Sequence, residues 1–135
     1  MENMFMQLNV SASALEAQKV RMNIIASNIA NMSSTQTPEG GPYKRKDVLF
    51  QTYLFGENAA GVDIPKIVED QRPFKKMFEP GHPDADKDGY VTYPNVNGIE
   101  ETVNLMTASR AYEANLTVIN SFRDMYLRAL DILKT

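Results

Sequence analysis

The chain has 135 residues, of which 43% are hydrophobic and 23% charged, with no cysteine and a net charge of −3. This length fits one ordinary domain, and the hydrophobic fraction is too high for a wholly disordered chain. Because the charge is mildly acidic and no segment is a basic block, a nucleic acid is not expected as the main partner. The absence of cysteine excludes disulfides and thiolate zinc sites.

The start of the chain does not read as a secretory signal peptide. Acidic Glu2 comes early, and no basic segment followed by a continuous apolar core is present. No run approaches ~20 apolar residues, so we expect no insertion into a membrane. If the protein leaves the cytoplasm, we expect it to use neither the general secretory route nor a membrane anchor.

Residues 3–32 carry a seven-residue hydrophobic repeat. The repeat consists of Leu8, Leu15, Met22 and Ile29, with Met4, Ile25 and Met32 at the neighbouring position. A strict seven-residue repeat keeps one seam facing a partner helix in a left-handed supercoil. The pattern therefore predicts a long helix, which should end near Met32 because a polar cluster and Pro38 follow.

The polar middle of the chain, residues 34–97, predicts short strands joined by turns. The expected strands are 48–54, 62–64 and 90–93, and the expected turns are 40–42 and 55–58. The strands are predicted from alternating hydrophobicity, and the turns from their glycine, proline and asparagine content. An irregular β-rich insert of this size should not be stable alone.

Residues 98–135 show the seven-residue repeat again, over more steps. It runs through Leu105, Tyr112, Ile119, Tyr126 and Leu133, with Leu116 and Leu130 at the second position and Val118, Met125 and Ile132 as a further flank. This apolar arc is wider than a two-stranded seam needs, which predicts packing against more than one neighbour. Asn97 or Asn95 is expected to cap the helix start, where Glu100 and Glu101 suit the positive end of the helix dipole.

Together these elements predict a mainly α fold, in which long N- and C-terminal helices pair as a coiled coil around a small β-rich insert. The expected divisions are 1–33, 34–97 and 98–135, with the first and last forming one coiled-coil domain. A simple antiparallel pair inside a monomer explains the pairing equally well. It leaves the second flank of the C-terminal helix exposed, however, and large apolar patches are rare on monomers. We therefore interpret the chain as an assembling protein.

No motif for catalysis or cofactor binding is present, and we predict neither an enzyme nor a bound cofactor or metal. Residues Asp84–Gly89 match the first half of an EF-hand calcium loop, but the twelfth position is Asn95, which cannot supply the bidentate carboxylate. The only histidine, His82, lies in a predicted loop. The basic run Lys44–Lys46 is interpreted as a solvated strand edge.

Four blocks of the chain resemble bacterial flagellar rod and hook proteins. They are ASNIAN (26–31), GGPYKRK and VLF (40–50), EPGHPDAD, DGYV and PNVN (79–97), and ASRAYEAN (108–115). The blocks occur in the family's order, and the one departure in the first is Ile29, where the family prefers leucine. The length fits the short proximal-rod members of the family rather than the longer distal-rod or hook proteins.

The resemblance implies a structural subunit of the basal-body proximal rod, in the periplasmic space, exported by the flagellar type III apparatus without a cleaved signal peptide. The implied partners are copies of itself, other rod proteins, the inner-membrane ring protein at the rod base and the export apparatus. The family's terminal segments are disordered in the isolated subunit and become coiled-coil helices on assembly.

The hydrophobic repeats and the family motifs together indicate which residues pack in the assembly. They are Leu8, Leu15, Met22, Ile25, Asn28, Ile29, Asn31, Leu105, Arg110, Tyr112, Asn115, Leu116, Ile119, Phe122, Tyr126 and Leu130. Asn28 and Asn31 either fix the register of the helices or cap a helix end. Two other classes remain open, a small helical adaptor or secretion chaperone and a calcium-responsive module using Asp84, Asp86 and Asp88.

Overall fold

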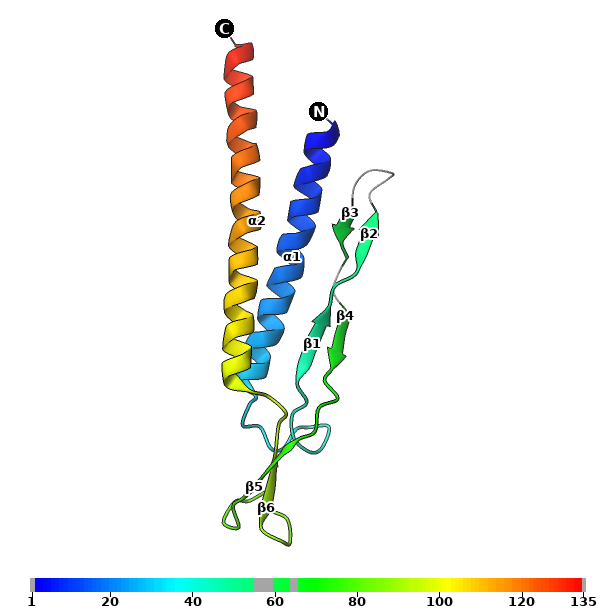
Figure 1. The fold of residues 1–135 in the computed structure, drawn as a ribbon, viewed down its shortest axis with the longest axis vertical. Coiled ribbons are helices and arrows are strands. Elements are labelled where there is room, and N and C mark those ends of the chain that lie inside the picture. The colour runs from blue at the N-terminus through cyan, green and yellow to red at the C-terminus, as the bar shows by residue number, and fades with distance from the viewer. Residues whose placement is uncertain (1, 55–59, 64–65, 135) are drawn as a thin grey trace. The chain divides into compact units, whose positions relative to one another are not determined.

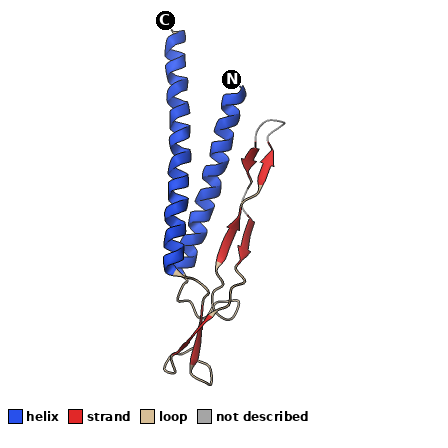
Figure 2. Ribbon diagram, viewed as in Figure 1, coloured by secondary structure: helices blue, strands red, loops and turns tan. Residues whose placement is uncertain are grey.

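The computed structural model describes residues 2–54, 60–63 and 66–134. In chain order the elements are α1 (Glu2–Ala30), β1 (Lys46–Leu49), β2 (Thr52–Leu54), β3 (Ala60–Val62), β4 (Lys66–Glu69), β5 (Lys75–Phe78), β6 (Tyr90–Tyr93) and α2 (Gly98–Leu133) (Figures 1 and 2). The predicted mainly α class, with a helix at each end and a small β insert between them, is confirmed. The coiled-coil pairing of the two helices stays a prediction.

Two helix boundaries fall where the sequence predicts, for reasons visible in their hydrogen bonds. The last turn of α1 is followed by a turn in which the Asn31 side-chain amide donates to the Ser27 carbonyl at 2.8 Å. At the start of α2, the Asn97 side-chain oxygen accepts from the backbone N–H groups of Ile99 and Glu100, at 3.1 and 3.4 Å. Asn97 is thus the N-cap, satisfying two donors that have no partner within the helix.

The described part of the insert forms three two-stranded sheets, pairing β1 with β4, β2 with β3, and β5 with β6. The predicted single strand over 48–54 is wrong, because the chain forms two strands there that belong to different sheets. The predicted strand at 90–93 is confirmed as β6. Its antiparallel partner β5 is not predicted from the sequence, because all four of its side chains are exposed and none marks a buried face. Predicted residues 55–58 and Ile64 lie outside the described residues.

The chain divides into two compact units, each built from parts of both helices and of the insert. Unit 1 comprises residues 1–22, 49–66 and 106–135, and unit 2 comprises residues 23–48 and 67–105. Among the described side chains, the buried hydrophobic ones are Ala17 and Ala108 in unit 1, and Ile25, Tyr43, Val48, Val91 and Val96 in unit 2. Large side chains are therefore buried mainly in unit 2. Over the described residues, neither helix contains a stretch long and apolar enough to span a bilayer.

The acidic stretch that resembles half a calcium loop is a tight turn between β5 and β6. One carboxylate oxygen of Asp86 accepts from the backbone N–H groups of Asp88 and Tyr90, at 3.0 and 2.8 Å. Asp84 accepts from the Thr35 hydroxyl at 2.6 Å. Because Asp86 bonds its own backbone two residues on, its carboxylate has the usual role of an Asx turn.

Gly89 closes this turn in a conformation that other residues rarely adopt. Its φ is +82°, and an added Cβ would lie 2.9 Å from Cε2 of Phe78. We therefore predict that Gly89→Ala destabilises the protein by about 1–2 kcal/mol, the usual cost of a left-handed backbone for an L-residue. Urea denaturation of the purified subunit measures this. Gly81→Ala is the matched control, since a Cβ there meets nothing within 4 Å, and equal midpoints for the two variants would contradict the prediction.

Candidate functional site

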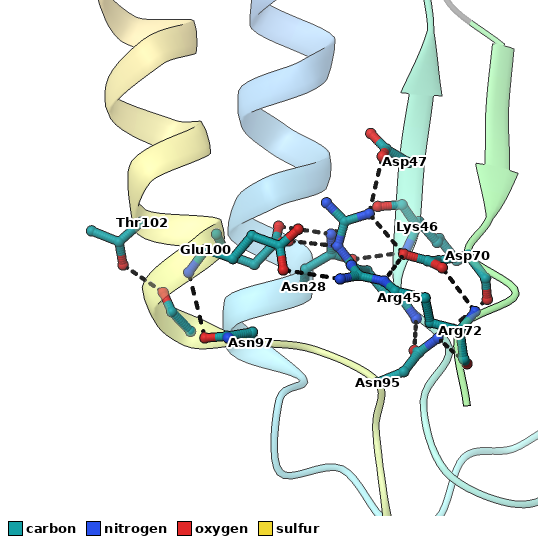
Figure 3. Close-up of polar contacts among 12 residues, drawn as sticks. Asn28, Arg45, Lys46, Asp47, Asp70, Arg72, Asn95, Asn97, Glu100 and Thr102 are labelled. Atoms are coloured by element: carbon teal, nitrogen blue, oxygen red, sulfur yellow. Dashed lines mark hydrogen bonds and ion pairs between the residues drawn. The ribbon is translucent and has the colours of Figure 1, made fainter. Parts of the chain in front are cut away.

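Arg45 is the centre of a buried polar junction in unit 2 (Figure 3). Its Nε donates to a carboxylate oxygen of Glu101 at 2.6 Å. Its Nη1 donates to Asp47 at 3.0 Å and to Asp70 at 3.2 Å. Its backbone N–H donates to the side-chain oxygen of Asn95 at 2.8 Å. The side chains of Arg45 and Glu101 are only 5% and 0% exposed, so this ion pair is buried.

Asn28, in the last turns of α1, joins the helix to both sides of this junction. Its side-chain nitrogen donates to the second oxygen of Glu101 at 3.0 Å and to the Lys46 carbonyl at 2.8 Å. Its side-chain oxygen accepts from the Lys46 N–H and the Tyr43 hydroxyl, both at 3.0 Å. All four hydrogen bonds that an amide side chain can make are therefore formed. Toward Lys46 the amide acts as a neighbouring strand would, accepting from its N–H and donating to its carbonyl.

Asn95 performs the same task on the other side of Arg45. Besides accepting from the Arg45 N–H, it donates to the carbonyls of Asp70 and Arg72, at 3.2 and 2.9 Å. The Asp70 N–H in turn donates to the Arg45 carbonyl at 2.8 Å. At the rim, the Arg72 guanidinium donates to Asp70 and to Glu100, at 2.8 and 3.0 Å. Separate segments of unit 2 are thus held by side-chain bonds rather than by one continuous sheet.

The charges of the junction stabilise one another. Burial by itself lowers the pKa of Arg45, but hydrogen bonds to Asp47 and Glu101 and their negative charges outweigh it, so the pKa is raised. Burial by itself raises the pKa of Asp70, but hydrogen bonds from the backbone and side chain of Arg72 outweigh it, so the pKa is lowered. Both groups are therefore held in their charged forms. A buried charge persists only when paired and hydrogen-bonded in this way.

The structure corrects the interpretation of the basic run as a solvated strand edge. Arg45 is buried, whereas Lys44 on one side of it is exposed and pairs with Glu69 at 3.4 Å. The sequence carries one signal for this arrangement. Tyr43 and Arg45 are both buried, as expected for alternate residues of an extended chain, so burial of the aromatic Tyr43 places Arg45 on the same inward face. For Glu101 the sequence indicates only a favourable place at the helix dipole, and no local pattern identifies its partner.

The predicted packing residues fall into three classes of burial. Ile25 and Asn28 are buried, and Arg110, Leu116, Tyr126 and Leu130 are exposed. Half-buried are Leu8, Leu15, Met22, Ile29, Asn31, Leu105, Tyr112, Asn115, Ile119 and Phe122. The structure brings Asn28 into the junction, whereas the Asn31 and Asn115 side chains donate to carbonyls four residues earlier in their own segments. The role of this residue set in packing between subunits stays a prediction.

The part of α2 that belongs to unit 1 exposes many large apolar side chains. They are Met106, Leu116, Val118, Met125, Tyr126, Leu127, Leu130, Ile132 and Leu133. Exposed apolar surface of this extent marks sites of association in soluble proteins. Within the described ranges, no group of three or more His, Cys, Asp or Glu side chains is placed to hold a metal ion. The features that stand out are therefore a buried polar junction in unit 2 and an apolar helix face in unit 1.

Comparison with known proteins identifies both ends of the chain. Residues 8–36 match the family described as flagella basal body rod protein, and residues 87–132 match the family described as flagellar basal body rod FlgEFG protein C-terminal. The flagellar basal-body rod protein FlgC of Borreliella burgdorferi is 42% identical, over 97% of this chain and 98% of its own. FlgC of Salmonella typhimurium is 44% identical (92% and 93% covered), and FlgC of Bacillus subtilis is 42% identical (96% and 98% covered).

We predict that Arg45→Met destabilises the subunit by about 3–5 kcal/mol, because it leaves the Glu101 carboxylate buried without its cation. The control is Lys44→Met, which removes an exposed ion pair with Glu69 and should cost less than about 1 kcal/mol. Adding Glu101→Gln to Arg45→Met should recover part of the loss. Urea denaturation of the parent and the three variants measures these differences. Equal midpoints for the Arg45 and Lys44 variants would show that the junction does not stabilise the fold.

Stability should also depend on pH through Asp70. Because the pKa of Asp70 in the folded state is below its ordinary 3.8, its stabilising effect is complete above that value and is lost as pH falls through the folded pKa. Asp70→Asn should therefore flatten the decline in the free energy of unfolding between about pH 5 and about pH 2. Asp124→Asn, at an exposed position of α2, removes the same charge as a control. An unchanged decline in the Asp70 variant would refute the assignment.

Proposed function

This chain belongs to the family of the flagellar basal-body rod protein FlgC, and we propose that its terminal helices assemble it into the rod after type III export. It is a structural subunit of the flagellar basal-body rod and not an enzyme. Its location is the basal-body rod, and other rod components are its partners. The proposal concerns how the subunit joins them.

The apolar face of α2 is the observation that carries the proposal. Large apolar side chains are exposed along this helix from Met106 to Leu133. Burying apolar surface contributes about 25 cal/mol per Å², so a neighbouring subunit that covers this face supplies a strong driving force for association. Contacts between unlike surfaces of successive subunits do not close on themselves, and such contacts build a helical shaft.

The half-buried seam of each helix completes the proposed packing. The proposed intramolecular seam consists of Leu8, Leu15, Met22 and Ile29 on α1 and of Leu105, Tyr112 and Ile119 on α2. The proposed contacts with neighbouring subunits are made by Leu116, Phe122, Tyr126 and Leu130 of α2. Ordering each helical residue costs about 1–2 kcal/mol in conformational entropy. A helix whose apolar face is covered only in the assembly therefore becomes fully ordered only there. Before assembly the subunit stays partly unfolded, which allows its export.

The finer partners and place follow from the same proposal. The chain passes through the flagellar type III export apparatus and takes its position in the periplasmic part of the rod, above the inner-membrane ring protein. The adaptor or chaperone alternative predicts a stable protein whose helices are covered in the monomer, and family membership does not favour it. The calcium alternative would use Asp84, Asp86 and Asp88; in the fold Asp84 accepts from the Thr35 hydroxyl and Asp86 accepts from the N–H of Asp88.

Placing a charge on the apolar face of α2 tests the proposal. We predict that Leu130→Asp leaves the subunit soluble and exported but abolishes its incorporation into the rod, because the carboxylate would be buried at the subunit contact. Thr117→Asp is the control: Thr117 is also exposed and lies on the polar stripe of α2 that carries Glu113, Asp124 and Arg128. Motility and electron cryotomography of basal bodies, in a strain whose own gene is deleted, provide the readout.

The seam is tested separately. Leu15→Asp and Ile119→Asp are both expected to prevent incorporation while leaving export intact. Rods of normal length in cells carrying Leu130→Asp, Leu15→Asp and Ile119→Asp would refute assembly through the terminal helices.

A further inference from the structure

The hairpin of β5 and β6 carries an exposed aromatic pair on one face. Phe78 and Tyr90 lie opposite each other in the register of the two strands, with their ring centroids 5.3 Å apart in an edge-to-face arrangement. They are 63% and 43% exposed, whereas Val91, on the other face of the hairpin, is fully buried. Lys76 lies two residues before Phe78, hence on the same face, and is also exposed. The hairpin thus presents two aromatic rings and a cation to solvent.

The position of the Phe78 ring is fixed by the turn beneath it. An added Cβ at Gly89 would lie 2.9 Å from Cε2 of Phe78, so the ring lies directly against the glycine. The Glu79 N–H donates to the Gly89 carbonyl at 2.9 Å, which closes the turn beside Phe78. Within unit 2 the hairpin lies beyond the first turn of α2, and residues 98–105 run away from it (Figure 1). The aromatic pair is therefore held in a defined position at one end of unit 2.

The last turns of α2 offer a surface of complementary charge. Leu127 and Leu130 are 47% and 36% exposed, and Asp131 is exposed on the same side, because residues three and four positions apart share a helix face. The C-terminal end of a helix carries a partial negative charge, which basic residues near it offset. The last turn of α2 contains Asp131 and no basic residue, and Lys134 comes only after the helix ends. Exposed apolar side chains and negative charge therefore lie together at this end of α2.

We propose that the Phe78–Tyr90 face of one subunit docks on the last turns of α2 in a second copy of this chain. The inference rests on the proposed function, because it names the surface that covers part of the apolar face of α2 in the rod. The aromatic rings pack on Leu127 and Leu130, and Lys76 lies against the carboxylate and the negative end of the helix. Because the two surfaces are unlike, the contact is head-to-tail and does not close, as a shaft requires.

The spacing of the groups on the two surfaces supports this contact. Two residues along a strand span about 7 Å, which is the separation of Lys76 and Phe78. Four residues along a helix span about 6 Å, which is the separation of Leu127 and Asp131. The apolar and charged groups therefore match in spacing as well as in sign. A second copy is the expected occupant because every copy of this chain carries both surfaces.

A cysteine pair tests whether the two surfaces meet. The chain contains no cysteine, so Lys76→Cys together with Asp131→Cys introduces its only two thiols. After isolated basal bodies are oxidised with copper phenanthroline, non-reducing electrophoresis and immunoblotting should show a band with the mass of two copies, which a reductant removes. Lys44→Cys together with Asp131→Cys is the control, because Lys44 is an exposed lysine of unit 2 outside the hairpin. The control pair should not form this band.

The aromatic pair is tested separately. We predict that Phe78→Ser lowers incorporation into the rod about tenfold or more, because aromatic residues at the centre of a contact contribute much of its binding free energy. Ile67→Ser is the control: Ile67 is also a large apolar residue on a strand of unit 2 and is 49% exposed, and its variant should incorporate normally. Immunoblotting of purified basal bodies measures incorporation. Urea denaturation of both purified variants should give similar midpoints, which separates lost docking from lost folding.

Several results would overturn the docking contact. They are a disulfide within a single copy, a cross-linked band of any other mass, no cross-link, an equal yield from the control pair, and normal incorporation of Phe78→Ser. Failure of this inference can be told from failure of the proposed function. If Leu130→Asp prevents incorporation but the Lys76 and Asp131 cysteine pair gives no band of two copies, assembly through the helices stands and only the docking contact falls. If Leu130→Asp incorporates normally, the proposed function itself fails.

Discussion

The buried ion pair of Arg45 and Glu101 is the constraint on which unit 2 depends. A charge removed from water is tolerated only beside an opposite charge and with its remaining hydrogen bonds formed. Arg45 lies in the insert and Glu101 in the first turn of α2, and Asn28 of α1 bonds the same carboxylate. Glu101 lies 56 positions beyond Arg45 and 73 beyond Asn28, so burying this pair requires three distant segments to meet at once. Neither the insert alone nor either helix alone can satisfy these groups.

The two units use their residues differently, and this difference follows the proposed role. Unit 2 buries aromatic and branched side chains and satisfies its polar groups internally, with Val91 and Glu101 fully buried. Among the side chains described in unit 1, the buried hydrophobic ones are the small Ala17 and Ala108, and most large side chains of its part of α2 are exposed. Unit 2 therefore has a buried centre of its own, whereas the part of α2 in unit 1 has extensive apolar surface that needs covering. Such a division suits a subunit that has one defined part before assembly and gains its last contacts from neighbours.

The sequence is sufficient for the elements that depend on local physics. The seven-residue repeats predict both helices, Asn97 is among the predicted caps, and the strand ending before Pro94 is predicted correctly. Prediction fails where a residue's environment is set by distant segments. Arg45 looks like one cation in a solvated run because nothing local shows that Glu101, Asp70 and Asn95 surround it. Strand β5 is missed for a related reason, since its side chains are exposed and only its pairing with β6 defines it.

The structure distinguishes the two roles left open for Asn28 and Asn31, fixing the register of the helices and capping a helix end. The role of Asn28 explains why a rod protein retains a polar junction that is costly to bury. Asn31 satisfies a carbonyl at the end of α1, a local role. Asn28 pairs with both backbone groups of Lys46 and with Glu101, and a shift of one residue in either partner would break these bonds. Replacing buried ion pairs by hydrophobic side chains is often neutral or stabilising, so stability alone does not require the junction. Hydrophobic contacts tolerate sliding, whereas a bidentate amide and a fixed ion pair allow one register, as polar residues do in coiled coils. In a shaft assembled from many copies of one subunit, a wrong register between the end of α1 and the start of α2 would misplace the contacts that each subunit makes with its neighbours.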